Sequence, residues 1–102
     1  MKLYFAPGAC SLAVHIALRE LGMAFDAVPV DLATHRLPDG RSYLDVSPRG
    51  YVPVLELDDG QRHSEAAALL QHLADQDPTQ ALIGPVGSAR RLGVTEWLAF
   101  VA

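Results

Sequence analysis

The fold is decided by the stretch KLYFAPGACSLAVHIALRELG at residues 2–22. Its apolar residues 3–5 predict a short strand, and Pro7-Gly8 predicts a turn after that strand. From Ser11 to Leu21 the apolar positions recur at helical spacing, and Gly22 stands where glycine often ends a helix. This stretch therefore predicts a strand followed directly by a helix.

Cys10 is the single cysteine of the sequence and lies at the predicted start of this helix. Free backbone N–H groups and the helix dipole favour the thiolate there, which is the nucleophilic form. Free cysteine is also among the most buried residue types and serves as a small hydrophobic residue. These residues alone leave a reactive thiol and a packing role equally open. For Ser11 we expect a helix cap rather than a hydrogen bond to a nearby sulfur.

Length and composition limit the class of protein. The 102 residues, half of them apolar, suffice for one compact domain and a tail. The formal charge of −4 argues against nucleic acid or an anionic membrane as a partner. A lone cysteine makes no intramolecular disulfide, and no secretory signal or apolar run of about 18 residues is evident. The expected location is the cytoplasm.

The middle of the sequence predicts one further strand and a long loop. Residues 25–32 alternate weakly, and Pro29 restricts that strand to a sheet edge because proline lacks the N–H donor. Residues 33–49 are polar and rich in proline, glycine and aspartate, which predicts an exposed loop with a short helix around residues 42–46. Loops of this size often line functional sites.

Two strands and a second helix are expected next. Residues 53–57 and 61–63 flank Asp59-Gly60, a dipeptide suited to the positive φ angles of a tight hairpin turn, so these strands should be antiparallel. Ser64 is expected to cap and open a helix that ends before Asp77-Pro78. Its apolar positions fall on one face: Leu69, Leu70, Leu73 and Ala74.

The order β-α-β, loop, β-β-α is that of an α/β thioredoxin-like domain with a mixed four-stranded sheet, although order alone is a weak signal. Three separated motifs add specificity: residues 1–12 (MKLYFAPGACSL), residues 47–55 (SPRGYVPVL) and Ser64-Glu65. Together they closely resemble the glutathione-binding domain of bacterial beta-class glutathione transferases. On this resemblance, residues 1–77 form the glutathione-binding domain, residues 78–87 a linker, and residues 88–102 the first helix of a truncated helical domain.

The resemblance implies a role for Cys10 and for the Val52-Pro53 segment. Cys10 would be the catalytic residue, lying against the glutathione sulfur and able to form a mixed disulfide with it. The Val52-Pro53 bond would be cis, and the Val52 backbone would pair with the cysteinyl part of glutathione like an added strand. Tyr51 departs from the family, which often carries a longer polar side chain at this position, and its ring would instead cover the ligand. Without the resemblance, Pro53 would be an ordinary proline at the start of a strand.

The resemblance also assigns the two ends of glutathione. The γ-glutamyl carboxylate would meet free N–H groups at the helix start, and Glu65 would hold the amino group. Ala66 stands where the family often has a small hydroxylated residue or glycine. Alanine keeps the backbone donor but has no hydroxyl, so we expect weaker binding by about 1.5 to 3 kcal/mol, the cost of one hydrogen bond to a charged group. His35 would approach the glycyl carboxylate. Ser64 and an acidic residue beside it also suit simple capping of the helix.

No metal site is expected, because the four histidines show no ligand spacing and the lone cysteine completes none. Alternation in the first strand makes Tyr4 a core residue, so it is not placed in the catalytic set. The apolar stripe Val94, Trp97, Leu98 and Val101 would be partly bare on a monomer. We therefore expect it to pack on its own domain or on another chain. The expected assembly is a homo-oligomer such as a dimer, or association with another chain through the 88–102 helix.

The predicted function is conjugation of reduced glutathione to a small electrophile, with glutathione as co-substrate and most of the electrophile pocket missing from these residues. One alternative is monothiol disulfide exchange, because the position three after Cys10 is Ala13 and not a resolving cysteine. Another is a non-catalytic glutathione-binding or interaction module whose terminal helix recruits a partner. Substitution of Cys10 should abolish exchange, reduce conjugation only in part and spare partner binding.

Overall fold

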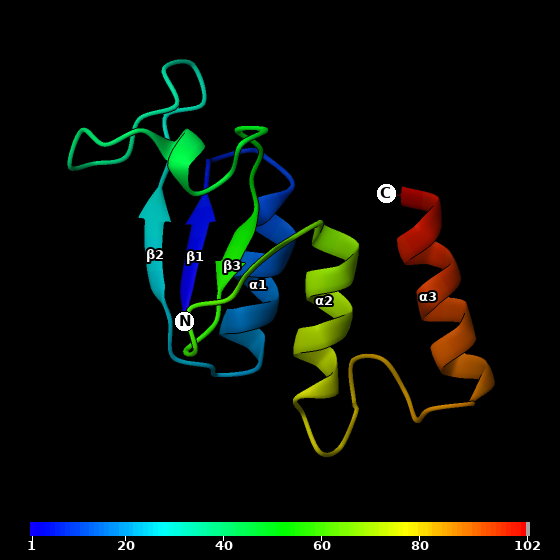
Figure 1. Ribbon diagram of the computed structural model, residues 1–102. Helices are drawn as coiled ribbons and strands as arrows, with labels where there is room; N and C mark the ends of the chain where they lie inside the picture. Colours follow the sequence, from blue (N-terminus) through cyan, green and yellow to red (C-terminus); the bar gives the residue numbers. More distant parts are fainter. Residues whose placement is uncertain (102) are drawn as a thin grey trace.

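The computed structural model of the chain describes residues 1–101, and Figure 1 shows its ribbon. Three α-helices, four strands and one short 3-10 helix follow one another in the predicted order. They are β1 (Lys2–Phe5), α1 (Ser11–Glu20), β2 (Asp26–Pro29), η1 (Tyr43–Asp45), β3 (Val54–Glu56), β4 (Arg62–Ser64), α2 (Ala66–Asp75) and α3 (Ala89–Val101).

The four strands form one mixed sheet in the order β2-β1-β3-β4. β1 runs parallel to β2 and antiparallel to β3, which is antiparallel to β4. The sheet confirms the predicted α/β fold class. As predicted, β2 lies at an edge, where Pro29 ends it and the next N–H, that of Val30, donates to the Phe5 carbonyl at 2.8 Å.

Strand alternation divides the core between the two faces of the sheet. Leu3 and Leu55 contribute to a cluster with α1 and α2, while Tyr4 and Val54 contribute to a second cluster that includes Tyr43 of η1. Figure 1 shows α1 behind the sheet, α2 beside it and α3 outermost. The starts of α1 and α2 and the end of α3 lie toward the same end of the molecule.

The β3-β4 hairpin forms where Asp59-Gly60 predicts it. The Leu57 N–H donates to the Gln61 carbonyl at 2.8 Å, and the Gly60 N–H donates to the Leu57 carbonyl at 2.9 Å. Of the dipeptide only Gly60 has a positive φ, of 88°. The turn therefore needs one left-handed residue, which glycine supplies without steric cost.

The predicted role of Ser64 as the cap of α2 is wrong. Ser64 is the last residue of β4 and pairs with Val54, so its backbone belongs to the sheet. Glu65 occupies the N-cap position instead, and α2 begins at Ala66. Pairing with the neighbouring strand has outweighed the local capping preference of serine, which is a weaker and purely local effect.

The α3 helix is tied to the rest of the chain near its start. The Arg91 guanidinium lies 2.7 Å from an Asp75 carboxylate oxygen and also donates to the Gly84 carbonyl at 3.0 Å. Along α3 no residue from 89 to 101 is fully buried. Within residues 1–101, no helix has the length and apolar character needed to cross a bilayer.

Within a single chain, the α3 stripe is only partly covered, and its predicted packing on another chain stays a prediction. Val94 and Leu98 are half-buried, whereas Trp97 remains 66% exposed and Val101 71% exposed. Trp97 stacks edge-on against Phe100, with ring centroids 5.6 Å apart, and Phe100 is exposed as well. The described chain therefore leaves an aromatic face of α3 uncovered.

Candidate functional site

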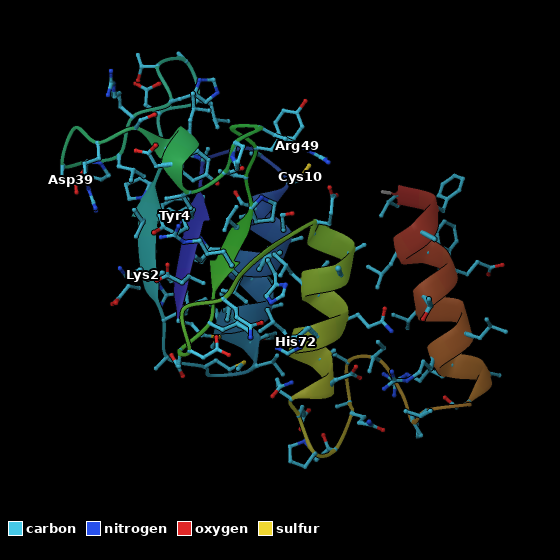
Figure 2. All side chains as sticks on the ribbon, viewed as in Figure 1. Lys2, Tyr4, Cys10, Asp39, Arg49 and His72 are labelled. Carbon is cyan, nitrogen blue, oxygen red and sulfur yellow. The ribbon has the colours of Figure 1, made fainter. Side chains whose placement is uncertain are left out.

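A cavity of about 850 Å³ lies where α1 and α2 begin. Segments far apart in the sequence line it, including the loop before α1, the loop before β3 and the C-terminal part of α3. Figure 2 places Cys10 and Arg49 at this end of the molecule and His72 away from it, on α2. The cavity brings together all the residues that the sequence predicts for the glutathione site: Cys10, His35, Tyr51, Val52, Pro53, Glu65 and Ala66.

Cys10 immediately precedes α1 and has an exposed side chain. Its φ and ψ of −57° and −21° are already helical, and its side chain makes no capping hydrogen bond. A packing role would bury the thiol. The observed position instead leaves the sulfur accessible from the cavity.

Ser11 is not a helix cap. Its side chain is fully buried, and its hydroxyl accepts a hydrogen bond from the Ala6 N–H and donates one to the Ala6 carbonyl, both at 3.2 Å. The chain between Ala6 and Ser11 folds back on itself, so the hydroxyl reaches the end of β1 rather than the first turn of α1. Ser11 thereby closes the loop that carries Cys10.

The segment from Tyr51 to Pro53 forms a second wall of the cavity. The Val52–Pro53 peptide bond is cis, as the family resemblance implies. Within residues 1–101, the Val52 N–H makes no hydrogen bond to another protein group. The Tyr51 carbonyl accepts a hydrogen bond from the Tyr43 hydroxyl at 2.7 Å, while the Tyr51 ring is exposed.

Tyr43 supports this wall, and sequence reasoning missed it. Its side chain is fully buried in the cluster around Tyr4. Burial raises the pKa of Tyr43 to about 12, so its phenol stays protonated and able to donate across the neutral range. In the sequence, Tyr43 stands out only as an aromatic residue in an otherwise polar loop. That pattern indicates that the ring is buried, but it does not identify the hydrogen-bond partner of the hydroxyl.

Glu65 and Ala66 form the third side of the cavity, at the start of α2. Glu65 has a φ of 71°, in the left-handed region that few residues other than glycine adopt. Its carbonyl accepts the Leu69 N–H at 3.0 Å, and its exposed side chain makes no capping hydrogen bond. The carboxylate therefore remains available, and the first N–H groups of α2 have no partner within the helix.

His35 adopts a second left-handed conformation, with a φ of 54°. Its ring lies against Gly50, where an added Cβ would overlap the imidazole, and Gly50 itself has a φ of 73°. The close approach therefore requires glycine at position 50. The His35 carbonyl accepts the Tyr43 N–H at 2.8 Å, which ties this loop to η1.

Several cavity residues were not identified from the sequence. Arg49 is the only lysine or arginine among the lining residues. Helical periodicity grouped Leu70 with the core, yet it is half-buried and faces the cavity together with Leu98 and Val101. Tyr4 is buried, in keeping with its expected core position. Among residues 1–101, no three histidine, cysteine, aspartate or glutamate side chains are grouped to hold a metal ion.

Comparison with known proteins agrees with the fold and with the motifs. Residues 8–76 match the sequence family described as "Glutathione S-transferase, N-terminal domain". The chain is 50% identical to glutathione S-transferase GstA of Escherichia coli O157:H7. The alignment covers all of this chain and 51% of the length of that relative.

Solved structures give the same result. The beta-class glutathione S-transferase of Sphingomonas chungbukensis superposes with a TM-score of 0.92 at 50% identity, covering 99% of this chain and 50% of that one. A sphingomonad glutathione S-transferase complexed with glutathione gives a TM-score of 0.91 at 48% identity, with the same coverage of both chains. The chain thus spans about half the length of the relatives that it matches. By sequence and by fold, it belongs to the glutathione S-transferase family.

Proposed function

We propose that the cavity binds reduced glutathione and that the protein transfers it to small electrophiles. The observation that carries the proposal is the meeting of three features in one cavity: the exposed Cys10 thiol, the Val52 N–H without a hydrogen-bond partner among residues 1–101, and the start of α2 with Glu65. Each feature matches a different part of glutathione, which has a thiol, one ammonium and two carboxylates.

The middle and the γ-glutamyl end of glutathione are recognised mainly by backbone. The Val52 N–H and carbonyl pair with the cysteinyl residue as with an added strand. The N–H groups that open α2 receive the γ-glutamyl carboxylate, favoured by the positive end of the helix dipole. The Glu65 carboxylate then binds the ammonium through a charge-assisted hydrogen bond. Its left-handed backbone fits this role, since unusual conformations concentrate at ligand sites.

The glycyl carboxylate is assigned to His35 and Arg49, which both line the cavity. Arg49 supplies a permanent positive charge for this carboxylate. Cys10 lies beside the glutathione sulfur, and the Tyr51 ring covers the bound tripeptide.

The proposed reaction is nucleophilic substitution or addition by the glutathione sulfur. The thiol loses its proton, the sulfur forms a bond to an electrophilic carbon, and a leaving group, where there is one, departs with its electron pair. The protein aligns the two reactants, which lowers the entropic part of the barrier. The apolar wall of Ala13, Leu70 and Leu98 suits the body of the electrophile. The remainder of the electrophile pocket would come from a helical domain that begins with α3 and follows the linker at 78–87. The last residue of the predicted 88–102 helix lies outside the described residues.

The exposed Cys10 thiol supports a second candidate, monothiol exchange. The Cys10 thiolate would attack a glutathione mixed disulfide, form a Cys10–glutathione disulfide and release the other thiol. A second glutathione would regenerate Cys10 as oxidised glutathione leaves. A Cys10→Ser variant should lose exchange completely, whereas glutathione binding and part of any conjugation should persist.

Calorimetric titration tests the proposal, with cysteinylglycine as the matched ligand that lacks the γ-glutamyl group. Glutathione should bind with one site per chain, and cysteinylglycine should bind much more weakly because α2 and Glu65 lose their partners. An aromatic halide assay in parallel shows whether the 102 residues catalyse conjugation. Equal affinities for the two ligands would refute the assignment of the α2 start, and absence of any glutathione binding at millimolar concentration would refute the function.

A further inference from the structure

We propose that Tyr43, which does not line the cavity, is a positioning residue that orients the Val52 N–H toward glutathione. This inference rests on the proposed glutathione site. Its evidence is the hydrogen bond from the Tyr43 hydroxyl to the Tyr51 carbonyl, 2.7 Å long and made by a fully buried side chain.

The hydroxyl acts through the peptide plane between Tyr51 and Val52. This peptide bond is trans, so its carbonyl and its N–H point in opposite directions. Tyr43 holds the carbonyl on the protein side. The Val52 N–H must then point away from Tyr43, and Val52 lines the cavity. One buried phenol therefore fixes the direction of the donor that the cysteinyl residue of glutathione needs.

Tyr43 also connects this wall to other parts of the site. Its N–H donates to the His35 carbonyl at 2.8 Å, and its carbonyl accepts the Ser47 N–H at 2.9 Å. His35 and Ser47 both line the cavity. These backbone bonds anchor η1 between two loops, so the phenol extends from a fixed base rather than from a mobile loop.

Tyr4 provides a matched control for the hydroxyl of Tyr43. It is also a buried tyrosine, its ring centroid lies 5.6 Å from that of Tyr43, and both belong to the same core cluster. Tyr4 does not line the cavity, and its hydroxyl makes no hydrogen bond to the Tyr51–Val52 peptide. Tyr43→Phe and Tyr4→Phe thus remove the same atom from the same cluster, and only the first releases the cavity wall.

The test compares glutathione affinity and the Val52 amide in the two variants. Without the phenol, the peptide samples other orientations and the binding-competent fraction falls, so Tyr43→Phe should weaken glutathione binding about five- to tenfold. In the ligand-free chain, its Val52 amide resonance should shift and broaden in ¹H–¹⁵N spectra. Tyr4→Phe should leave both the affinity and the resonance unchanged. Circular dichroism confirms that each variant is folded.

The outcomes separate this inference from the proposed function. Unchanged affinity in Tyr43→Phe, or an equal loss in Tyr4→Phe, overturns the positioning role. Failure of the unsubstituted chain to bind glutathione overturns the proposed function instead. In that case the Val52 amide resonance of the ligand-free variants still shows whether Tyr43 orients the Tyr51–Val52 peptide.

A measurement on the unsubstituted sequence covers the case in which Tyr43→Phe does not fold. The chain has three tyrosines, so 3-fluorotyrosine labelling gives three ¹⁹F resonances, of which Tyr4→Phe and Tyr51→Phe identify two. The remaining Tyr43 resonance should shift as glutathione saturates the cavity, although Tyr43 does not line it. A Tyr43 resonance that glutathione leaves in place would overturn the inference.

Discussion

Two residues of the cavity, His35 and Glu65, hold left-handed backbone conformations without being glycine. Such conformations cost about 1 to 3 kcal/mol each and persist only where the surrounding structure fixes them. Here the carbonyl of His35 accepts the Tyr43 N–H, and that of Glu65 accepts the Leu69 N–H. The fold thus stabilises both residues in conformations that present their side chains to the cavity.

At position 66 a hydroxyl should strengthen glutathione binding. Ala66 is the first residue of α2 and lines the cavity, so a serine there can donate to the γ-glutamyl carboxylate in addition to the backbone. A hydrogen bond to a charged group contributes about 1.5 to 3 kcal/mol, and we therefore expect Ala66→Ser to bind glutathione at least about tenfold more tightly by calorimetry. Ala68→Ser, on the exposed side of the same helix turn, should not change the affinity. Equal or weaker binding by Ala66→Ser would contradict this placement of the carboxylate.

The buried phenol of Tyr43 predicts a loss of stability in alkali. Its pKa is raised by burial from about 10 to about 12, so above pH 10 the unfolded chain releases a proton that the folded chain retains. The contribution of this group is complete below pH 10 and is lost as the pH rises to about 12. Urea unfolding across this range should show the decline. In Tyr43→Phe that part of the decline should be absent, and an identical alkaline profile would contradict the burial of the phenol.

At the level of elements, the sequence predicts most helices and strands because their signals are local. Period-two alternation in β1, the Asp59-Gly60 turn and the apolar spacing of α1 and α2 all match the structure. The errors fall on two serines. Ser64 pairs with Val54 in the sheet, and the Ser11 hydroxyl bonds to the Ala6 backbone. Both partners lie outside the helix start, whereas a capping preference considers only the residues at that start.

Gly93 lowers the stability of α3, because glycine inside a helix is a poor helix former. The glycine lies inside the helix, and a Cβ added there would meet no atom within 4 Å beyond its chain neighbours and the backbone of its own helix. Alanine should therefore stabilise the helix by about 1 kcal/mol, because it restricts the unfolded backbone and adds no clash. Urea unfolding followed by circular dichroism measures the gain. Gly50→Ala serves as the contrast and should destabilise the chain, since its Cβ would overlap His35 at a left-handed φ. Loss of stability in Gly93→Ala would contradict the open surroundings of this residue.

For the whole molecule, the motifs of the sequence identified the segments that meet in the cavity but not what holds them there. Cys10, Val52 and Glu65 stand in three recognisable motifs, so their convergence was predictable from the family resemblance. The roles of Tyr43 and Arg49 were not predictable from the motifs. Tyr43 acts through the carbonyl of a residue eight positions away, and Arg49 becomes a candidate binding residue only once the cavity that it lines is known.

Whether the aromatic face of α3 stays exposed depends on how the whole chain packs, and the fluorescence of Trp97 measures that exposure. It is the single tryptophan of the sequence and is 66% exposed. In a dilute chain that sedimentation shows to be monomeric, its fluorescence should be quenched by iodide nearly as well as that of free tryptophan. A Phe100→Ala variant, which removes the stacked ring, should increase the quenching further. Shielded, blue-shifted emission from the monomer would contradict the exposed position.

Titration of the ¹⁵N-labelled chain with reduced glutathione, followed at every backbone amide, shows whether one cavity binds glutathione through Cys10, the Val52 backbone and the start of α2. We expect saturable shifts concentrated at Cys10, Val52 and Ala66, with little change at Glu96 on the exposed side of α3. Saturable shifts centred elsewhere, or none at millimolar glutathione, would overturn this binding site.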